Sequence, residues 1–259
     1  MTILERFSLR DKVILLTGGT GLYGRQLTSA IAEAGAQLVI ASRNLERLQQ
    51  VADEEGKRGY SVHVEAFDQG EEQSILALRE RILRQHGGID GLVNNSVLRP
   101  MKGPNAPLAA WNDSMRINAT GLFLMTRAFG DSMAQRQKGS IVNIGSIQGM
   151  VGPSLNLYEG TDLGTPAPDY FFHKGGMINL TRYFASLFGA KGVRVNCVSP
   201  GGFFTGQPEP FLSRYCLKTM LGRMADENDL GGPIVFLLSD AARYITGANL
   251  AVDGGYTAK

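Results

Sequence analysis

A tyrosine and a lysine four residues apart are the first side chains in this 259-residue sequence whose types and spacing could do chemistry. Tyr170 and Lys174 open a long helical pattern, so we expect them one turn apart on one helix face. An ammonium beside a phenol favours the phenolate and lowers the phenol's pKa from about 10. Such a phenol exchanges a proton with an alcohol or a carbonyl near neutral pH. A core tyrosine followed by a surface lysine gives the same spacing, so the pair needs support from other motifs.

Polar residues also stand close to the ends of several apolar, strand-like runs. Ser146 follows the run at 140–144, and Asn118 lies just before a long apolar helical segment. In a parallel sheet the ligand lies beyond the carboxyl ends of the strands, so residues that follow different strands meet there. We therefore expect these residues at one site. The other members of the group are Asn94, Asn95, Ser96, Pro200, Gly201 and Thr205.

A glycine-rich turn between a strand and a helix predicts a phosphate-binding loop with the spacing GxxGxxG. Gly18 would permit the sharp turn, Gly21 a close backbone approach to a pyrophosphate, and Gly24 tight packing of helix on strand. The free N–H groups and positive dipole end of the following helix would attract the phosphates. A glycine turn without a ligand is the alternative, and the flanking strand and helix favour binding. The predicted loop comprises Gly18, Thr20, Gly21, Leu22, Tyr23 and Gly24.

The end of the second strand predicts which dinucleotide binds. A carboxylate there would accept the ribose 2′-hydroxyl of NAD, but this strand ends in Ser42 and Arg43. Both side chains can donate hydrogen bonds to a 2′-phosphate, the arginine through its fork of N–H groups. We therefore predict NADP as the preferred cofactor, with NAD possible. Arg43 as an ordinary solvated residue at a helix start is the alternative.

The elements that would position these residues alternate regularly between strand and helix. The strands read as continuous apolar runs, which is typical of strands buried on both faces of a parallel sheet. This alternation predicts an α/β, doubly wound fold in a single domain over residues 1–259. We place strands at 12–17, 37–41, 61–67, 90–94, 140–144, 193–198 and 249–252. We place helices at 22–34, 45–57, 71–85, 122–137, 170–190 and 229–239.

Composition narrows the possible partners. With 43% hydrophobic and 19% charged residues the chain can bury a full core, and a net charge of +2 gives no footprint for nucleic acid. No apolar stretch is long enough for a membrane span, and the first residues lack the apolar core of a signal peptide. Two cysteines make neither a disulfide framework nor a CxxC metal pair. We expect a cytoplasmic protein that binds neither nucleic acid nor membranes.

Taken in order, the motifs resemble the short-chain dehydrogenase/reductase family over almost the whole chain. The family is known for a single-domain Rossmann fold with a seven-stranded parallel sheet and helices on both faces. The resemblance implies hydride transfer between a nicotinamide and a carbonyl or secondary alcohol, and usually a homotetramer or homodimer. The matching stretches are TGGTGLYG, Asp68 after the third strand, NNSV, the Asn118 segment, IVNIGS, YFFHK, VNCVSPGG and VDGGY.

The resemblance also implies a role for each matching residue. Tyr170 would be the general acid and base, and Lys174 would bind the nicotinamide ribose and lower the pKa of Tyr170. Ser146 would hydrogen-bond the substrate oxygen, and Asn118 would hold a water in a proton relay. Further contacts would come from Asp68 to adenine, Asn94 to the region of the adenine-side ribose, and Thr205 to the carboxamide.

Two short motifs depart from the family pattern. Most short members carry TGxxxGxG, whereas the GxxGxxG spacing here is similar to the extended branch of nucleotide-sugar epimerases and dehydratases. We therefore expect a locally different turn. NNSV replaces the usual NNAG, and the β-branched Val97 cannot easily take backbone conformations that favour glycine. The loop on the cofactor side is therefore expected to differ in shape.

The third departure is an insert at about 155–169, which lengthens the interval from Ser146 to Tyr170 by about ten residues. Tyr158 lies at the usual interval, but Asp162 instead of lysine follows it by four residues. Prolines before position 169 argue against a helix there, and Asp169 is a suitable N-cap, so Tyr170 is our general acid. The insert is either a lid on the active site or a surface loop. Its residues able to bind a polyhydroxy substrate are Tyr158, Glu159, Thr161 and Asp162.

Other residues near these motifs have two interpretations each. Arg99 and Lys102 could attract an anionic substrate such as a sugar acid, although we favour solvated surface charge for both. The family uses the segment after Gly201 to cover the substrate, but core packing explains its aromatic residues equally well. These are Phe203, Phe204 and Phe211. The histidines lack ligand spacing, so we expect no metal site, and we place His173 off the face shared by Tyr170 and Lys174.

Two other functions remain open beside a dehydrogenase acting on a sugar-type molecule. One is an epimerase or dehydratase that uses its nicotinamide transiently, as the glycine spacing suggests. The other is a dinucleotide-binding regulator without catalysis, which would need none of the four catalytic residues together. The helices at 122–137 and 170–190 also carry apolar side chains on more than one stripe, which predicts a homo-oligomer. These side chains are Phe123, Leu124, Phe184 and Leu187.

Overall fold

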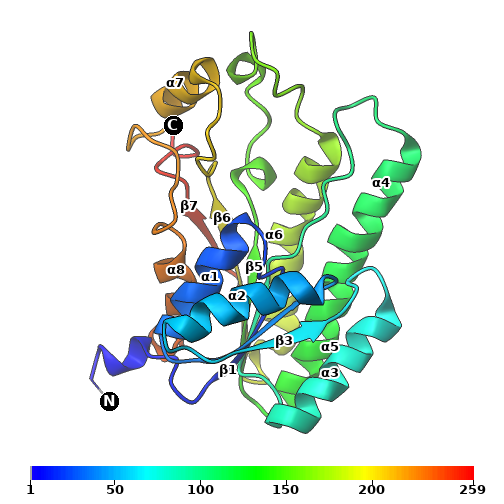
Figure 1. Cartoon of the computed structure of the whole chain (residues 1–259), viewed down its shortest axis with the longest axis vertical. Coiled ribbons are helices and arrows are strands. Elements are labelled where there is room, and N and C mark those ends of the chain that lie inside the picture. The colour runs from blue at the N-terminus through cyan, green and yellow to red at the C-terminus, as the bar shows by residue number, and fades with distance from the viewer. Residues whose placement is uncertain (1) are drawn as a thin grey trace.

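Seven parallel strands form one sheet in the computed structural model, which describes residues 2–259 (Figure 1). Their order is β3-β2-β1-β4-β5-β6-β7, so the direction of winding reverses between β1 and β4. This reversal is the point where doubly wound sheets bind ligands. The predicted seven-stranded Rossmann fold is confirmed. The strands are β1 (Val13–Thr17), β2 (Gln37–Ser42), β3 (Val62–Ala66), β4 (Gly91–Asn94), β5 (Gly139–Ile144), β6 (Val193–Pro200) and β7 (Asn249–Val252).

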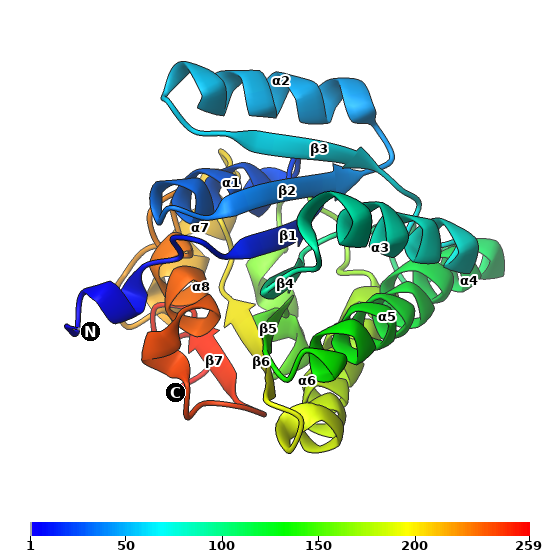
Figure 2. The ribbon, with the colours of Figure 1, turned by 90° about the horizontal axis from the view of Figure 1, so that it is seen from below.

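Helices cover both faces of the sheet (Figure 2). The first face packs against α1 (Leu22–Glu33), α2 (Leu45–Lys57) and α8 (Gly231–Leu238). The second packs against α3 (Glu72–His86), α5 (Leu122–Gln135) and α6 (Pro168–Gly189). Two further helices are α4 (Leu108–Ser114) and α7 (Glu209–Lys218).

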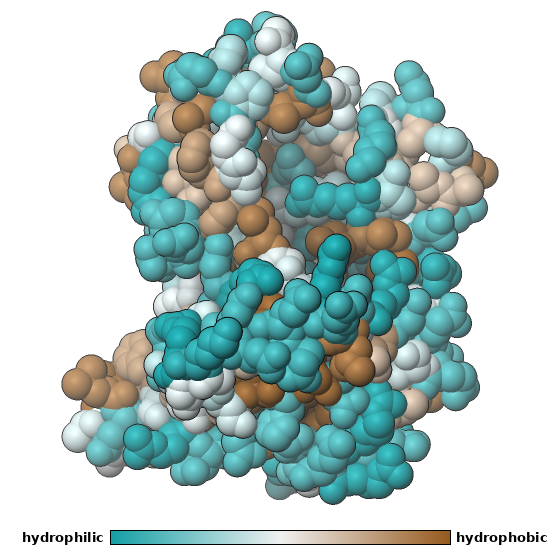
Figure 3. Space-filling model, viewed as in Figure 1, coloured by the Kyte–Doolittle hydropathy of each residue, from teal (hydrophilic) through white to brown (hydrophobic). Residues whose placement is uncertain are grey.

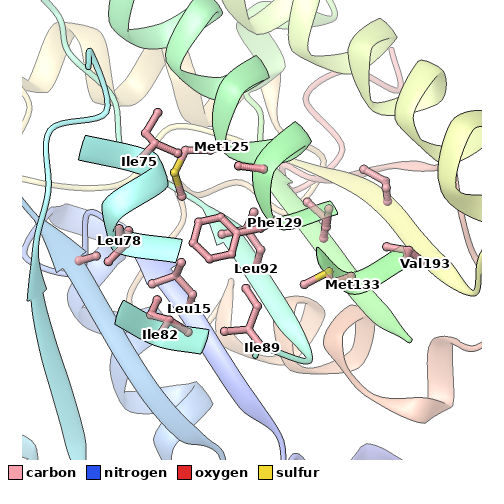
Figure 4. Close-up of a cluster of buried hydrophobic side chains, with 14 of the residues drawn as sticks. Leu15, Ile75, Leu78, Ile82, Ile89, Leu92, Met125, Phe129, Met133 and Val193 are labelled. Atoms are coloured by element: carbon pink, nitrogen blue, oxygen red, sulfur yellow. The ribbon is translucent and has the colours of Figure 1, made fainter. Parts of the chain in front are cut away.

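Alternate residues of each strand supply the two cores. In β1, Leu15 points to the α3–α5–α6 side, whereas Ile14 and Leu16 point to the α1–α2–α8 side. Figure 4 shows the core on the α3–α5–α6 side, where Phe129 of α5 lies beside Leu92 of β4. Continuous apolar strands are therefore explained by burial on both faces.

Three helical features differ from prediction. Helices α4 and α7 were not predicted, since both are short and carry residues such as Asn112 and Pro210 that weaken a helical signal. A seven-residue π-helical segment, Met115–Gly121, joins α4 to α5. The prediction of Asp169 as N-cap of α6 is wrong, because the helix starts at Pro168 and Ala167 is its N-cap. Proline suits this first position because its missing N–H would have no partner within the helix.

The apolar side chains predicted for oligomer contacts divide into two groups. Phe123 and Leu187 are exposed, as a second partner would require. Phe184 is buried in the core and Leu124 packs against that core, so these two belong to the inward-facing stripe of their helices. No helix within residues 2–259 is both long enough and apolar enough to cross a membrane.

Candidate active site

One large cavity, of about 780 Å³, lies beyond the carboxyl ends of the strands. It is visible as a recess whose mouth has hydrophobic and hydrophilic borders (Figure 3). Segments as distant in sequence as Gly18 and Tyr256 line it. The predicted site residues that line it are Gly18, Thr20, Gly21, Leu22, Tyr23, Ser42, Arg43, Asp68, Asn95, Ser96, Ser146, Tyr170, Lys174, Pro200, Gly201 and Thr205.

The glycine turn has the backbone geometry expected of a phosphate-binding loop. Gly18 has a φ of 70°, which favours glycine, and Gly21 caps the start of α1 in an extended conformation. A Cβ at Gly24 would collide with the backbone carbonyl of Gly18, so the third glycine lets helix and turn pack closely. Gly24 itself does not line the cavity.

The loop after β4 is tied to this turn by hydrogen bonds. The Thr17 hydroxyl accepts from the backbone N–H groups of Asn95 at 3.0 Å and Ser96 at 3.1 Å. The Asn95 amide donates to the carbonyl oxygens of Thr17 and Gly18. Val97 lines the cavity with a negative φ, so the backbone at this position does not need glycine.

Asn94 and Asn118 do not line the cavity, although both were predicted as site residues. The Asn94 amide is buried and donates to Asn143 at 2.8 Å, linking β4 to β5. Asn118 lies in the π-helical segment, and its amide donates to the Leu98 carbonyl and accepts from the Leu98 N–H. Both side chains therefore hold the strand ends in place from behind the cavity wall.

The nucleotide end of the cavity carries more positive charge than predicted. Arg43 and Arg47 both line it, and neither forms an ion pair within residues 2–259. Arg47 lies on the first turn of α2, where Asn44 caps its backbone N–H at 2.9 Å. Arg47 was not predicted to line the cavity, because it lies five residues beyond the end of β2, whereas the cofactor prediction used only residues at that strand end.

Tyr170, Lys174 and Ser146 meet in the middle of the cavity, as predicted. Lys174 is buried, lies 5.5 Å from the centre of the Tyr170 ring and donates to the Ile144 carbonyl. Burial raises the pKa of Tyr170, but the charges of Lys174 and Arg99, with hydrogen bonding from Arg99 and Ser146, outweigh it and lower the pKa overall. The phenol is thus held in an environment that favours proton release.

Arg99, for which we favoured a solvated surface charge, is exposed and also borders the cavity. Its guanidinium carbon lies 4.3 Å from the centre of the Tyr170 ring, and the side chain lines the cavity. The side chain is exposed, in agreement with that expectation, and the sequence did not show that it also lies against Tyr170. Lys102, on the same loop, is exposed and does not line the cavity.

His173 is buried and does not line the cavity that Tyr170 and Lys174 line, in agreement with its expected place off their shared face. Its ring packs edge-to-face on Tyr170, with centroids 5.2 Å apart. Burial, together with the charges of Lys174 and Arg99, lowers the pKa of His173 to about 3. The imidazole is therefore neutral across the working pH range. Within residues 2–259 no group of three or more potential ligands could hold a metal ion.

The insert lies against the substrate end of the cavity. Leu157 of the insert is buried and lines the cavity, as does Tyr158, which packs edge-to-face on Phe211 of α7. Arg214 of α7 donates to the carbonyls of Asn156 at 2.9 Å and Glu159 at 2.5 Å. Figure 1 shows α7 and this segment at the same end of the molecule. Of the four candidate substrate contacts in the insert, only Tyr158 lines the cavity; the other three are Glu159, Thr161 and Asp162.

Aromatic side chains from the C-terminal half complete this end. Phe203 and Phe211 line the cavity, whereas Phe204 is exposed outside it. Tyr215 and Tyr256, which were not predicted as site residues, also line the cavity, and their tilted rings have centres 5.0 Å apart. Burial raises the pKa of Tyr215 to about 12, and its oxygen accepts from the Gly202 N–H, so it stays a neutral phenol.

Fold and site together define a class, the nucleotide-dependent oxidoreductases with a Rossmann fold. The family model described as enoyl-(acyl carrier protein) reductase matches residues 23–257. The chain is 33% identical to 2-(S)-hydroxypropyl-CoM dehydrogenase 3 of Xanthobacter autotrophicus, covering 96% of this chain and 98% of the relative. It is 31% identical to 2-dehydro-3-deoxy-D-gluconate 5-dehydrogenase of Bacillus subtilis, covering 98% of each.

A solved structure gives the same result. A gluconate 5-dehydrogenase from Burkholderia cenocepacia, in complex with NADP and tartrate, superposes with a TM-score of 0.90 at 29% identity, covering 100% of both chains. The chain belongs to the short-chain dehydrogenase/reductase family. It is an NAD(P)-dependent oxidoreductase that acts on CH–OH groups.

Proposed function

We propose that this chain is an NADP-dependent dehydrogenase or reductase that interconverts a secondary alcohol and a ketone in a sugar-type molecule. The observation that carries this proposal is the position of Tyr170, which lines the cavity between the nucleotide turn and the insert while two cations lower its pKa. Relatives that act on gluconate derivatives support the sugar-type substrate.

The residues at the nucleotide end fit a dinucleotide. The glycine turn offers backbone N–H groups and a helix N-terminus to the pyrophosphate. Ser42 and Arg43 would donate to a 2′-phosphate, with Arg47 as a further cation, and the NADP complex of the structural relative supports this preference. Asp68 would contact adenine and Thr205 the carboxamide. When bound, the nicotinamide accepts or supplies the hydride.

The residues at the middle of the cavity would move the proton. In alcohol oxidation the Tyr170 oxygen takes the hydroxyl proton, and in ketone reduction it returns a proton to the carbonyl oxygen. Ser146 would donate to the same substrate oxygen as negative charge develops there. Lys174 would bind the nicotinamide ribose and keep the pKa of Tyr170 low. Asn118 would support a proton relay by fixing the Leu98 backbone.

A substrate screen tests this proposal. Purified protein is offered sugars, sugar acids, alcohols and ketones with NADP or NAD, and absorbance of the reduced cofactor is followed. Net turnover with NADP as the better cofactor is the expected result. Tightly bound nucleotide with product formation but no net oxidation or reduction of the cofactor would indicate an epimerase or dehydratase. Nucleotide binding without any conversion would indicate a regulator.

We also propose that the chain works as a homo-oligomer, a tetramer or a dimer. Exposed aromatic and aliphatic side chains gather on α5 and α6, and large exposed apolar patches mark interaction surfaces. These side chains are Phe123, Phe172, Tyr183 and Leu187. Light scattering after size-exclusion chromatography should give a mass of two or four chains, and a monomer would contradict the proposal.

The whole chain is proposed to act as one domain in the cytoplasm. The cavity draws its lining from segments between Gly18 and Tyr256, so no part of the chain forms the site alone. Both cysteines are free thiols, and burial raises the pKa of Cys197 to about 11, which suits a reducing compartment. Cell fractionation tests the location, and limited proteolysis tests the single domain.

A further inference from the structure

The middle and the substrate end of the cavity carry positive charge that no carboxylate balances. Arg99 and Lys174 both line the cavity close to Tyr170. Among the lining residues the only acid is Asp68, which follows β3 and accepts a hydrogen bond from the Gly70 N–H. Within residues 2–259 no ion pair joins Arg99 to a carboxylate. A guanidinium that borders a concave site and has no carboxylate partner attracts an anion.

The contacts of Arg99 leave most of its hydrogen-bonding capacity free. Arg99 is exposed, its guanidinium lies over the Tyr170 ring, and its one polar contact within the described chain is with that same side chain. A guanidinium has five N–H donors in a planar fork, which matches the two oxygens of a carboxylate. The backbone of the loop is held by Asn118 through both hydrogen bonds to Leu98, so Arg99 projects from a fixed point.

We infer that Arg99 is a carboxylate-binding site within the active site, and that the substrate is a hydroxy acid or the matching keto acid. This inference rests on the proposed function, because it places the reacting carbon at Tyr170 and Ser146. The guanidinium that would hold the carboxylate also touches the ring of the general acid, so the carboxylate lies only a few bonds from the reacting carbon. Gln148, Ser154 and Tyr158 line the same end and can hydrogen-bond further hydroxyl groups.

Matched substrate pairs test the inference. Lactate, tartrate and gluconate are each compared with their primary amide, which keeps the carbon frame but removes the charge. The native enzyme should prefer the acid of the best pair by roughly 10- to 100-fold in kcat/KM, as expected for charged hydrogen bonds. Arg99→Gln should bring this ratio close to one. Arg99→Lys keeps the charge but loses the fork, so it should retain part of the preference.

Lys102→Gln is the matched control, since it removes one positive charge from the same loop at an exposed position outside the cavity. The acid-to-amide ratio should stay at its native value in this variant. The ratio is the decisive quantity because loss of Arg99 also alters Tyr170, and that change affects both members of a pair equally. A native preference for amides, or an acid preference that survives in Arg99→Gln, overturns the inference.

A binding measurement separates this inference from the proposed function. Tartrate is titrated calorimetrically into NADP-loaded protein at low salt. Native protein and Lys102→Gln should bind it, and Arg99→Gln should bind at least about ten times more weakly. Equal binding by all three proteins, or none by the native protein, counts against the carboxylate site. Arg99-dependent binding without turnover of any pair would support the site and count against the proposed function.

Discussion

The nucleotide end and the substrate end of the cavity differ in whether backbone or side chains form them. The nucleotide end consists mainly of backbone and short loops at the ends of β1, β2 and β4, fixed by the sheet and by bonds such as Thr17 to Asn95. The substrate end consists mainly of side chains from the insert, α7 and Tyr256. The first end can hold one kind of ligand rigidly. At the substrate end, substitution of side chains can change which ligand binds. Mutations that affect cofactor recognition should therefore differ from those that affect substrate recognition.

The largest effect is expected at the point where the two ends meet. Tyr170→Phe removes the proton donor and should lower kcat by about 10²- to 10⁴-fold while the melting temperature stays near native. Tyr158→Phe, which removes a hydroxyl at the substrate end, should chiefly raise KM. Steady-state kinetics of both variants check this. A severe loss of kcat in Tyr158→Phe with near-native Tyr170→Phe would mean that the general acid is misassigned.

The glycine turn should tolerate almost no added atoms. In Gly24→Ala the new Cβ meets the Gly18 carbonyl, and the backbone must shift, at a cost of about 1–3 kcal/mol in unfolding free energy. Gly56→Ala, on α2 with nothing within 4 Å of its Cβ position, should instead stabilise the fold by about 0.5–1 kcal/mol. Urea unfolding measures both. Equal effects would argue against close packing at the turn.

Cofactor choice should depend on the nucleotide end alone. Arg43→Ala removes a donor to the 2′-phosphate and should lower kcat/KM for NADP by roughly 10- to 100-fold, with little change for NAD. The ratio of the two cofactors at a fixed substrate concentration is the measurement. An equal loss with both cofactors would contradict a 2′-phosphate contact.

The pH dependence should report on Tyr170. The base in alcohol oxidation is the phenolate, so kcat rises with pH, with a midpoint below the value of about 10 for a free tyrosine. Arg99→Gln removes a cation that lowers this pKa, so the midpoint moves to higher pH, whereas Lys102→Gln leaves it in place. His173 stays neutral and adds no inflection. The measurement uses a neutral alcohol, and an unchanged midpoint in Arg99→Gln would show that Arg99 does not act on the phenol.

The smallest effect is expected where the insert is fastened to α7. Arg214→Ala removes two hydrogen bonds to insert carbonyls and should raise the substrate KM a few-fold, by about 1 kcal/mol of binding free energy. The KM for NADP should not change. A change in the cofactor KM of the same size would mean that the two ends are not independent.

The contrast between the two ends also explains what the sequence could predict. The strands, the glycine turn and the Tyr170–Lys174 pair depend on local patterns, such as apolar runs and fixed spacings, and all three were placed correctly. Tyr215 reaches the cavity through tertiary packing, and no local pattern marks it, whereas Tyr256 stands in the VDGGY stretch, to which the sequence assigned no contact. The roles of the site residues stay predictions.

Arg99 and Asn94 both show that the sequence does not determine where a side chain points. A charge after a strand end is usually solvated, and only the fold shows that Arg99 lies over Tyr170. An asparagine at a strand end suggests a ligand contact, but the Asn94 amide bonds to Asn143 within the sheet. Spacing along the chain fixes which strand a residue follows, but not which way its side chain turns.

A crystal structure with NADP bound would test the central claim most directly. The account predicts the 2′-phosphate beside Ser42 and Arg43, and the reactive face of the nicotinamide beside Tyr170 and Ser146, leaving room for a substrate carbon at about 3–3.5 Å. A nicotinamide bound elsewhere, or a Tyr170 hydroxyl directed away from it with no other proton donor within reach, would contradict the account.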